Sequence, residues 1–356
     1  MNLSLGIVGL PNVGKSTLFN ALTKQNVLAA NYPFATIDPN VGVVAVSDKR
    51  ITQISEISKP EKIIPAVIEF VDIAGLVKGA ASGAGLGNKF LSHIKEVSAI
   101  VQVVRAFADG NITHVENSVD PKRDIELVQT ELGLKDIDTV SNRINGIKSR
   151  ARFDKLLLAE LEHLEALLKY LEEGKLAFDF EKPKDEEVLM ARKSLFLLTD
   201  KPVIYLVNSD DQKSAEMIKD IVGNKTVIVM DVKTESELAG FDDAERQEFM
   251  KEFGLEETGL DRLTKAAYET LGLISFFTEG PEEVRAWTIL KDSKAPEAGA
   301  AIHTDFQKKF IACDVCYYQD FLDAGGWNKA KEIGKVRLEG KEYVVKDGDI
   351  MIFRHG

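Results

Sequence analysis

The stretch Gly9-Leu-Pro-Asn-Val-Gly-Lys-Ser-Thr17 decides the fold of this chain. It fits the pattern G-x-x-x-x-G-K-[ST], in which a glycine-rich loop wraps the phosphates of a nucleotide. The apolar run at residues 3–8 predicts a strand that enters the loop, and the pattern at residues 18–22 predicts a helix that leaves it. This order predicts a P-loop nucleotide-binding domain built on an α/β sheet.

The loop has the groups that a triphosphate needs. We expect the α- and β-phosphates to be held at the positive end of the new helix by Asn12, Val13, Gly14, Lys15, Ser16 and Thr17. Lys15 would contact the β- and γ-phosphates as the catalytic cation, and the Ser16 hydroxyl would bind Mg²⁺.

Two further segments carry predicted switch residues. Thr36 lies in a proline-containing stretch after the P-loop helix, where a second Mg²⁺ ligand is expected. Apolar runs at 41–46 and 66–71 predict strands, and the second run ends in Asp72-Ile-Ala-Gly75. Asp72 would hold Mg²⁺ through water, and the Gly75 N–H would approach the γ-phosphate.

The residue after Gly75 bears on the hydrolysis step. Many switch GTPases have a water-orienting Gln there, but this chain has Leu76, which cannot form a hydrogen bond through its side chain. Another group must then orient the attacking water. His114 is a candidate because a neutral imidazole can do this at physiological pH, and a surface histidine without a catalytic role is the alternative.

A base-reading loop is predicted after the strand at 203–207. Asn208-Ser-Asp-Asp211 resembles the N-K-x-D motif of GTPases, with Ser209 in place of the Lys. A carboxylate at Asp211 could accept hydrogen bonds from guanine, whereas adenine offers no such pair of donors. A second base-side loop is expected around Val232, after the strand at 226–230.

Composition limits the class of protein. The 356 residues, 44% hydrophobic and 29% charged, suit a globular protein of two or three domains. The sequence has no run of 18 apolar residues and starts directly with a predicted strand, so we expect neither a membrane span nor a signal peptide. Two cysteines indicate a reducing compartment, and we expect a cytoplasmic location.

The net charge of −12 argues against a general affinity for nucleic acid. A local basic cluster, opposed only by Asp154, is formed by Arg143, Lys148, Arg150, Arg152 and Lys155. It is either a nucleic-acid patch or a solvated helix end.

The rest of the chain predicts two more units. Leucines from 157 to 171 repeat in a heptad rhythm, which predicts an inserted helical hairpin or short coiled coil. The C-terminal part predicts a small α+β unit, with a helix at 304–311 and short strands at 284–289, 336–338, 343–346 and 350–353. Cys313 and Cys316 would face opposite sides of a strand, which disfavours a metal site.

Together these motifs resemble the YchF family of Obg-like ATPases over the whole chain. The resemblance is carried by residues 9–17, Phe-Val-Asp-Ile-Ala-Gly-Leu-Val-Lys-Gly-Ala at 70–80, Val-Arg-Ala-Trp-Thr-Ile at 284–289 and Ile-His-Thr-Asp-Phe at 302–306. It implies a doubly wound P-loop domain (1–122 and 196–275), a helical coiled-coil insertion (123–195) and a C-terminal ubiquitin-like β-grasp domain of the TGS type (276–356).

The resemblance also implies hydrolysis of ATP to ADP and phosphate, and association with ribosomes in translation or stress response. Asn12 matches the P-loop Asn of potassium-stimulated relatives, so K⁺ beside the phosphates is a hypothesis, and His114 matches a residue that the family is thought to use in hydrolysis. The family usually has Glu where this chain has Asp211, which leaves GTP or dual use open. We expect a monomer. The alternatives are a scaffold that nucleotide only stabilises and, less well served by the sequence, a small-molecule kinase.

Overall fold

The computed structural model describes residues 3–24, 40–73, 86–107, 119–211 and 213–356. The chain divides into two compact units. Among the described residues, the first unit contains 3–24, 40–42 and 70–259, and the second contains 43–69 and 260–356. The division passes through two strands, β2 (Val41–Ala45) and β4 (Val67–Asp72).

A six-stranded sheet organises the first unit, with the order β2-β4-β1-β5-β6-β7. The remaining strands are β1 (Ser4–Val8), β5 (Ala99–Arg105), β6 (Val203–Asn208) and β7 (Thr226–Met230). β1, β5, β6 and β7 pair in parallel, which brings their carboxyl ends to one edge of the sheet. Every residue of β1 and β5 is buried, as expected for parallel strands that helices cover on both faces.

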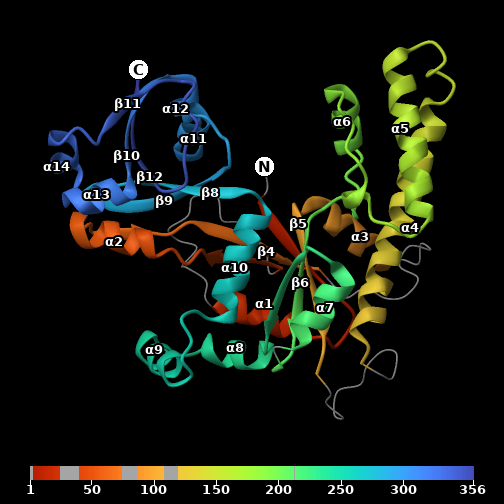
Figure 1. Cartoon of the computed structure of the whole chain (residues 1–356), viewed down its shortest axis with the longest axis horizontal. Coiled ribbons are helices and arrows are strands. Elements are labelled where there is room, and N and C mark those ends of the chain that lie inside the picture. Colours follow the sequence, from red (N-terminus) through yellow and green to blue (C-terminus); the bar gives the residue numbers. More distant parts are fainter. Residues whose placement is uncertain (1–2, 25–39, 74–85, 108–118, 212) are drawn as a thin grey trace. The chain divides into compact units, whose positions relative to one another are not determined.

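The first unit also contains the following helices, most of which Figure 1 labels. They are α1 (Lys15–Lys24), α3 (Leu86–Glu96), α4 (Pro121–Ile147), α5 (Lys155–Glu172), α6 (Glu186–Lys193), α7 (Ser214–Val222), α8 (Val232–Leu238) and α9 (Asp243–Glu252). The start of α4 and the helix α7 pack on β5, β6 and β7 through a cluster that includes Ile125, Ile218 and Tyr205.

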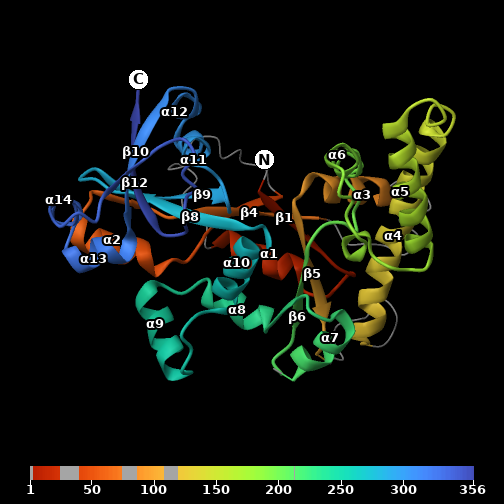
Figure 2. The ribbon, with the colours of Figure 1, turned by 45° about the horizontal axis from the view of Figure 1, so that its top comes forward.

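The predicted helical hairpin is present. Helices α4 and α5 run side by side in both views (Figures 1 and 2). Val140, Ile144, Leu164 and Leu171 belong to one buried cluster between them, so the heptad leucines form the core of the hairpin. The fully buried Arg192 of α6 bonds both carboxylate oxygens of Asp200 and the Ala177 carbonyl.

A second six-stranded sheet organises the second unit, in the order β11-β10-β12-β8-β9-β3. Its strands are β3 (Lys62–Ile64), β8 (Leu273–Thr278), β9 (Glu283–Leu290), β10 (Phe310–Tyr317), β11 (Arg337–Glu339) and β12 (Asp349–His355). The hairpin β8–β9 lies beside β12, which is parallel to β8 and antiparallel to β10. The order β11-β10-β12-β8-β9 is the β-grasp arrangement that the family resemblance implied, and β3 pairs with the outer edge of β9.

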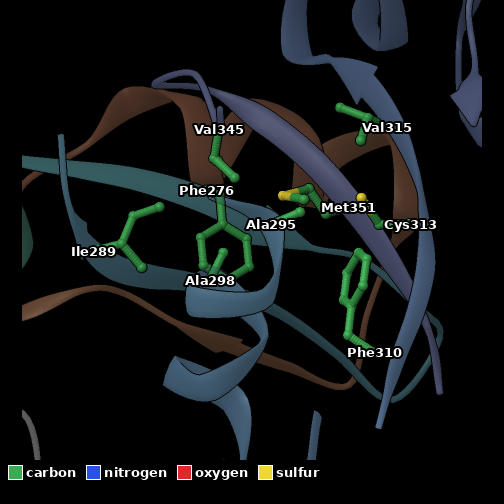
Figure 3. Packing of buried hydrophobic residues seen from close by; sticks show 9 residues of the cluster. All are labelled: Phe276, Ile289, Ala295, Ala298, Phe310, Cys313, Val315, Val345 and Met351. Carbon is green, nitrogen blue, oxygen red and sulfur yellow. The ribbon is translucent and has the colours of Figure 1, made fainter. Parts of the chain in front are cut away.

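Helices complete the second unit: α2 (Lys49–Ser58), α10 (Gly259–Thr270), α11 (Ala295–Ile302), α12 (Thr304–Lys308), α13 (Tyr318–Ala324) and α14 (Trp327–Glu332). Figure 3 shows one side of the sheet, where Phe276, Phe310 and Met351 pack with Ala295 and Ala298 of α11.

Three local predictions need correction. The helix expected over 304–311 ends at Lys308, because Phe310 already enters β10 and packs in the core of the sheet. Residues 343–346 do not form a strand: only Val344 makes an isolated bridge, to Lys294. Arg143 does not belong with the other residues of the predicted basic cluster, because it pairs with the buried carboxylate of Glu160 through hydrogen bonds of 2.6 and 2.9 Å.

Candidate functional site

The P-loop has the strained backbone that its sequence predicts. Gly9 and Gly14 have φ angles of +153° and +105°, which favour glycine, and the non-glycine Asn12 adopts φ +63°. A Cβ on Gly14 would lie 2.6 Å from Asn208 Nδ2, so a side chain here would clash with the neighbouring loop. Helix α1 begins directly after this turn, with the Leu18 N–H donating to the Gly14 carbonyl at 2.9 Å.

Lys15 is held inside the loop. Its side chain is 8% exposed, and Nζ donates a hydrogen bond of 2.7 Å to the Leu10 carbonyl. Burial lowers the pKa of Lys15 from 10.5 to about 8, and the charge of Asp72 partly offsets this effect. Burial also raises the pKa of the Asp72 carboxyl, again with a smaller opposing effect of Lys15. An ammonium desolvated in this way gains stability from any further anion placed beside it.

Asn208 connects the P-loop to the start of α8. Its Nδ2 donates to the Val13 carbonyl at 2.9 Å, and its Oδ1 accepts from the Val232 N–H at 3.2 Å. Both bonds are buried, so the amide positions two loops relative to each other.

In the loop at residues 208–211, the polar groups of Ser209 and Asp211 form hydrogen bonds with other groups of the protein. The Ser209 N–H donates to the Met230 carbonyl, which extends the pairing of β6 with β7, and Ser209 Oγ accepts from the Asp211 N–H at 3.1 Å. Asp211 Oδ1 in turn accepts from the Lys213 N–H at 2.9 Å.

These loops surround a cavity of about 910 Å³ at the carboxyl edge of the parallel strands. It is lined by Asn12, Gly14, Thr17, Ala106, Phe107, Asn208, Ser209, Asp210, Asp211, Ser214, Asp231, Val232 and Lys233. The volume and the mixed polar and aromatic lining suit a nucleoside-sized ligand.

Sequence comparisons identify the family of this chain. A family described as "50S ribosome-binding GTPase" matches residues 4–143, and the YchF-GTPase_C family, described as a protein of unknown function, matches residues 273–356. The chain is 50% identical to the "Ribosome-binding ATPase YchF" of Bacillus subtilis and 48% identical to that of Haemophilus influenzae. Each match covers 99% of both sequences.

The chain belongs to the YchF family.

A solved structure agrees with this assignment. The YchF GTPase of Schizosaccharomyces pombe is similar with a TM-score of 0.88 at 41% sequence identity, covering 99% of this chain and 98% of that one. The predicted fold class, a P-loop α/β domain with the YchF C-terminal domain, is confirmed.

The structure of this YchF-family chain brings most predicted site residues together. The cavity joins Asn12, Gly14 and Thr17 with Asn208, Ser209, Asp211 and Val232. Val13 is buried beside the cavity through its bond to Asn208, Ser16 is exposed in the first turn of α1, and Asp72 ends β4. Thr36, Gly75, Leu76 and His114 lie outside the described residues.

Sequence reasoning missed one wall of the cavity. Ala106 and Phe107 follow β5 directly. The Cζ atom of the buried Arg105 lies 4.5 Å from the centroid of the Phe107 ring, so the guanidinium packs against the ring. The available signal was positional: β5 is a central parallel strand, and residues just beyond its carboxyl end belong to the ligand edge.

Three further observations concern the part of the chain that the structure describes. No group of three or more His, Cys, Asp or Glu side chains is arranged there to hold a metal ion. Cys313 lies in the core of the β-grasp sheet and Cys316 on the opposite side of β10. None of the helices in the described ranges combines the length and apolar composition that a bilayer crossing needs.

Proposed function

We propose that this chain binds ATP in the cavity, hydrolyses it to ADP and phosphate, and changes its association with ribosomes according to the bound nucleotide. One observation carries the proposal: a single cavity joins the P-loop to the loops at 208–211 and 231–233. The names of the similar proteins, "Ribosome-binding ATPase YchF", support the ATPase activity and the association with ribosomes.

The P-loop would hold the phosphates in this proposal. The amides of residues 12–17 and the positive end of α1 face the phosphates, and the Lys15 ammonium stabilises the charge that develops on the transferred phosphoryl group. Triphosphate oxygens would also raise the depressed pKa of Lys15, so binding keeps this ammonium protonated.

Magnesium fits the oxygen donors near the loop. The Ser16 hydroxyl lies in the first turn of α1, and the Asp72 carboxylate is close enough to Lys15 for each to shift the pKa of the other. When bound, Mg²⁺ would neutralise charge on the β- and γ-phosphates. Ser16 and Asp72 would hold it, with Thr36 as a further predicted ligand.

The proposal includes further features that the sequence predicts. They are the N–H of Gly75 at the γ-phosphate, water orientation by His114, K⁺ beside Asn12, a monomeric state, a cytoplasmic location, and the division into domains at 1–122 with 196–275, 123–195 and 276–356. Equal rates of hydrolysis in sodium and potassium buffers would count against the K⁺ site.

The residues of the predicted base-reading loop favour ATP over GTP as the substrate. A guanine reader of the N-K-x-D type needs a lysine where this chain has Ser209, and the Ser209 N–H is committed to the Met230 carbonyl. The Asp211 carboxylate bonds the Lys213 N–H, which competes with a guanine for the same oxygen. Asp211 nevertheless lines the cavity, so GTP is the second candidate substrate.

Competition between ATP and GTP for one labelled nucleotide on purified protein tests this assignment. We expect ATP to displace the label at lower concentration, and Asp211→Glu to sharpen the preference because a longer side chain misplaces the guanine-reading carboxylate. Asp210→Glu makes the same chemical change at the preceding cavity residue and serves as the control. A strong preference of the unaltered chain for GTP would overturn the choice of ATP.

The scaffold alternative is tested through Lys15. If hydrolysis drives the cycle, Lys15→Ala abolishes turnover and uncouples ribosome co-sedimentation from the added nucleotide. Full biological activity of this variant would favour a scaffold whose turnover is incidental.

A further inference from the structure

The loop that joins α4 to α5, residues 148–154, is an ordered tip of the helical hairpin (Figure 2). The Arg150 and Ala151 N–H groups both donate to the Ile147 carbonyl at 2.9 Å, and the Phe153 N–H donates to the Arg150 carbonyl at 3.0 Å. Ala151 is buried, and Asp154 caps α5 by accepting from the Leu156 N–H. The backbone of this hairpin tip is therefore fixed by its own hydrogen bonds.

The hairpin tip concentrates positive charge on an acidic protein. Lys148, Arg150, Arg152 and Lys155 are all exposed, while the chain as a whole has a net charge of −12. Within the described residues none of the four forms an ion pair, unlike Arg143, which Glu160 neutralises lower on the hairpin. The one acidic residue among them, Asp154, is engaged as the helix cap.

An aromatic ring projects from the same tip. Phe153 is 93% exposed, and Leu156, three residues later in the sequence, is 38% exposed. A phenyl ring held in water by an ordered backbone loses little conformational entropy when a partner covers it. Cations around one exposed ring are the combination with which proteins hold unpaired nucleotides: the cations contact phosphates and a base stacks on the ring.

We propose that the hairpin tip is an RNA-binding surface, at which Phe153 stacks on an unpaired base and Lys148, Arg150 and Arg152 contact the flanking phosphates. The inference rests on the proposed association with ribosomes and identifies ribosomal RNA as the part that the tip contacts. We infer an RNA partner and not a protein partner because four clustered cations complement the continuous row of phosphates in a nucleic acid.

Binding of a fluorescein-labelled uridine 20-mer to the full-length protein tests the tip directly. Phe153→Ala should weaken binding roughly five- to hundredfold, the range found for loss of base stacking. Lys148→Ala/Arg150→Ala/Arg152→Ala should weaken it at least tenfold and reduce the slope of log K against log salt by about 2, from about 0.7 per lost phosphate contact. The control, Lys308→Ala/Lys309→Ala/Lys331→Ala, removes the same charge from exposed positions of the second unit and should bind as the unaltered chain does.

Two further measurements, co-sedimentation with 70S ribosomes and ATP turnover without ribosomes, distinguish a failure of the RNA-binding inference from a failure of the proposed ribosome association. The expected result is loss of ribosome binding by the tip variants with unchanged turnover. Tip variants that bind the 20-mer like the unaltered chain overturn the inference, and if they also lose ribosomes, the tip contacts a ribosomal protein. If the unaltered chain does not sediment with ribosomes, the proposed ribosome association fails, while the 20-mer still decides whether the tip binds RNA.

Discussion

Replacement of Lys15 by Met should separate the stability of the free protein from its affinity for nucleotide. Met has a similar length and no charge, so it fits the space of the lysine stem without the buried ammonium. We expect Lys15→Met to be as stable as the unaltered protein, or more stable, in the absence of nucleotide and to gain nothing from Mg-ATP.

The magnitude follows from the surroundings of the ammonium. Lowering the pKa from 10.5 to about 8 corresponds to about 3 kcal/mol of unfavourable free energy for the charged form in the folded state. Loss of the donor to the Leu10 carbonyl costs about 1–3 kcal/mol in return. The net change at pH 7 should lie between about 0 and 2 kcal/mol in favour of the variant.

The pH dependence has a definite sign. Because the folded-state pKa lies below that of the unfolded chain, the unfolded state binds more protons between about pH 8 and 10.5. The stability of the unaltered protein therefore rises over this interval relative to Lys15→Met, and the advantage of the variant disappears.

Urea unfolding at pH 7 and pH 10, with and without Mg-ATP, measures these quantities. At a hundred times Kd, Mg-ATP should stabilise the unaltered protein by about 2.7 kcal/mol and leave the variant unchanged. Lys24→Met, at the exposed end of the same helix, is the control. The reasoning is refuted if Lys15→Met costs more than about 1 kcal/mol at pH 7, or if the difference between the two proteins is the same at both pH values.

Three other perturbations test the fold and the site. Gly14→Ala should abolish ATP binding and destabilise the protein by about 2 kcal/mol in urea unfolding, because the added Cβ would clash with Asn208 and because alanine disfavours the φ angle of +105° at this position. As a control, Gly146→Ala adds a Cβ in open space on α4 and should stabilise the protein by about 0.5–1 kcal/mol. Arg192→Ala leaves the Asp200 carboxylate and a buried carbonyl without their donor and should cost about 3–5 kcal/mol, seen as a lower urea midpoint. Cys313 and Cys316 should resist a thiol reagent at pH 8 until urea unfolds the chain, since burial raises their pKa values to about 12 and about 11; rapid labelling in native buffer would contradict their burial.

Much of the architecture was predictable because its signals are local. A buried parallel strand such as β5 is a continuous apolar run, the hairpin leucines repeat with a heptad period, and residues 9–17 form a phosphate-binding loop only in a narrow range of backbone geometry. Each of these constraints acts on residues close together in the sequence, so each can be inferred from the sequence alone.

Contacts between distant residues were decided only by the tertiary structure. β3 has three residues and no pattern of its own, and it is a strand because β9, more than two hundred residues later, offers it an edge to pair with. In the same way, Phe107 lines the cavity because β5 ends beside the P-loop. Glu160 removes Arg143 from the basic cluster because α5 folds back on α4. A sequence states which groups are present, but which charges cancel and which side chains share a cavity depends on through-space distances that only the folded chain sets.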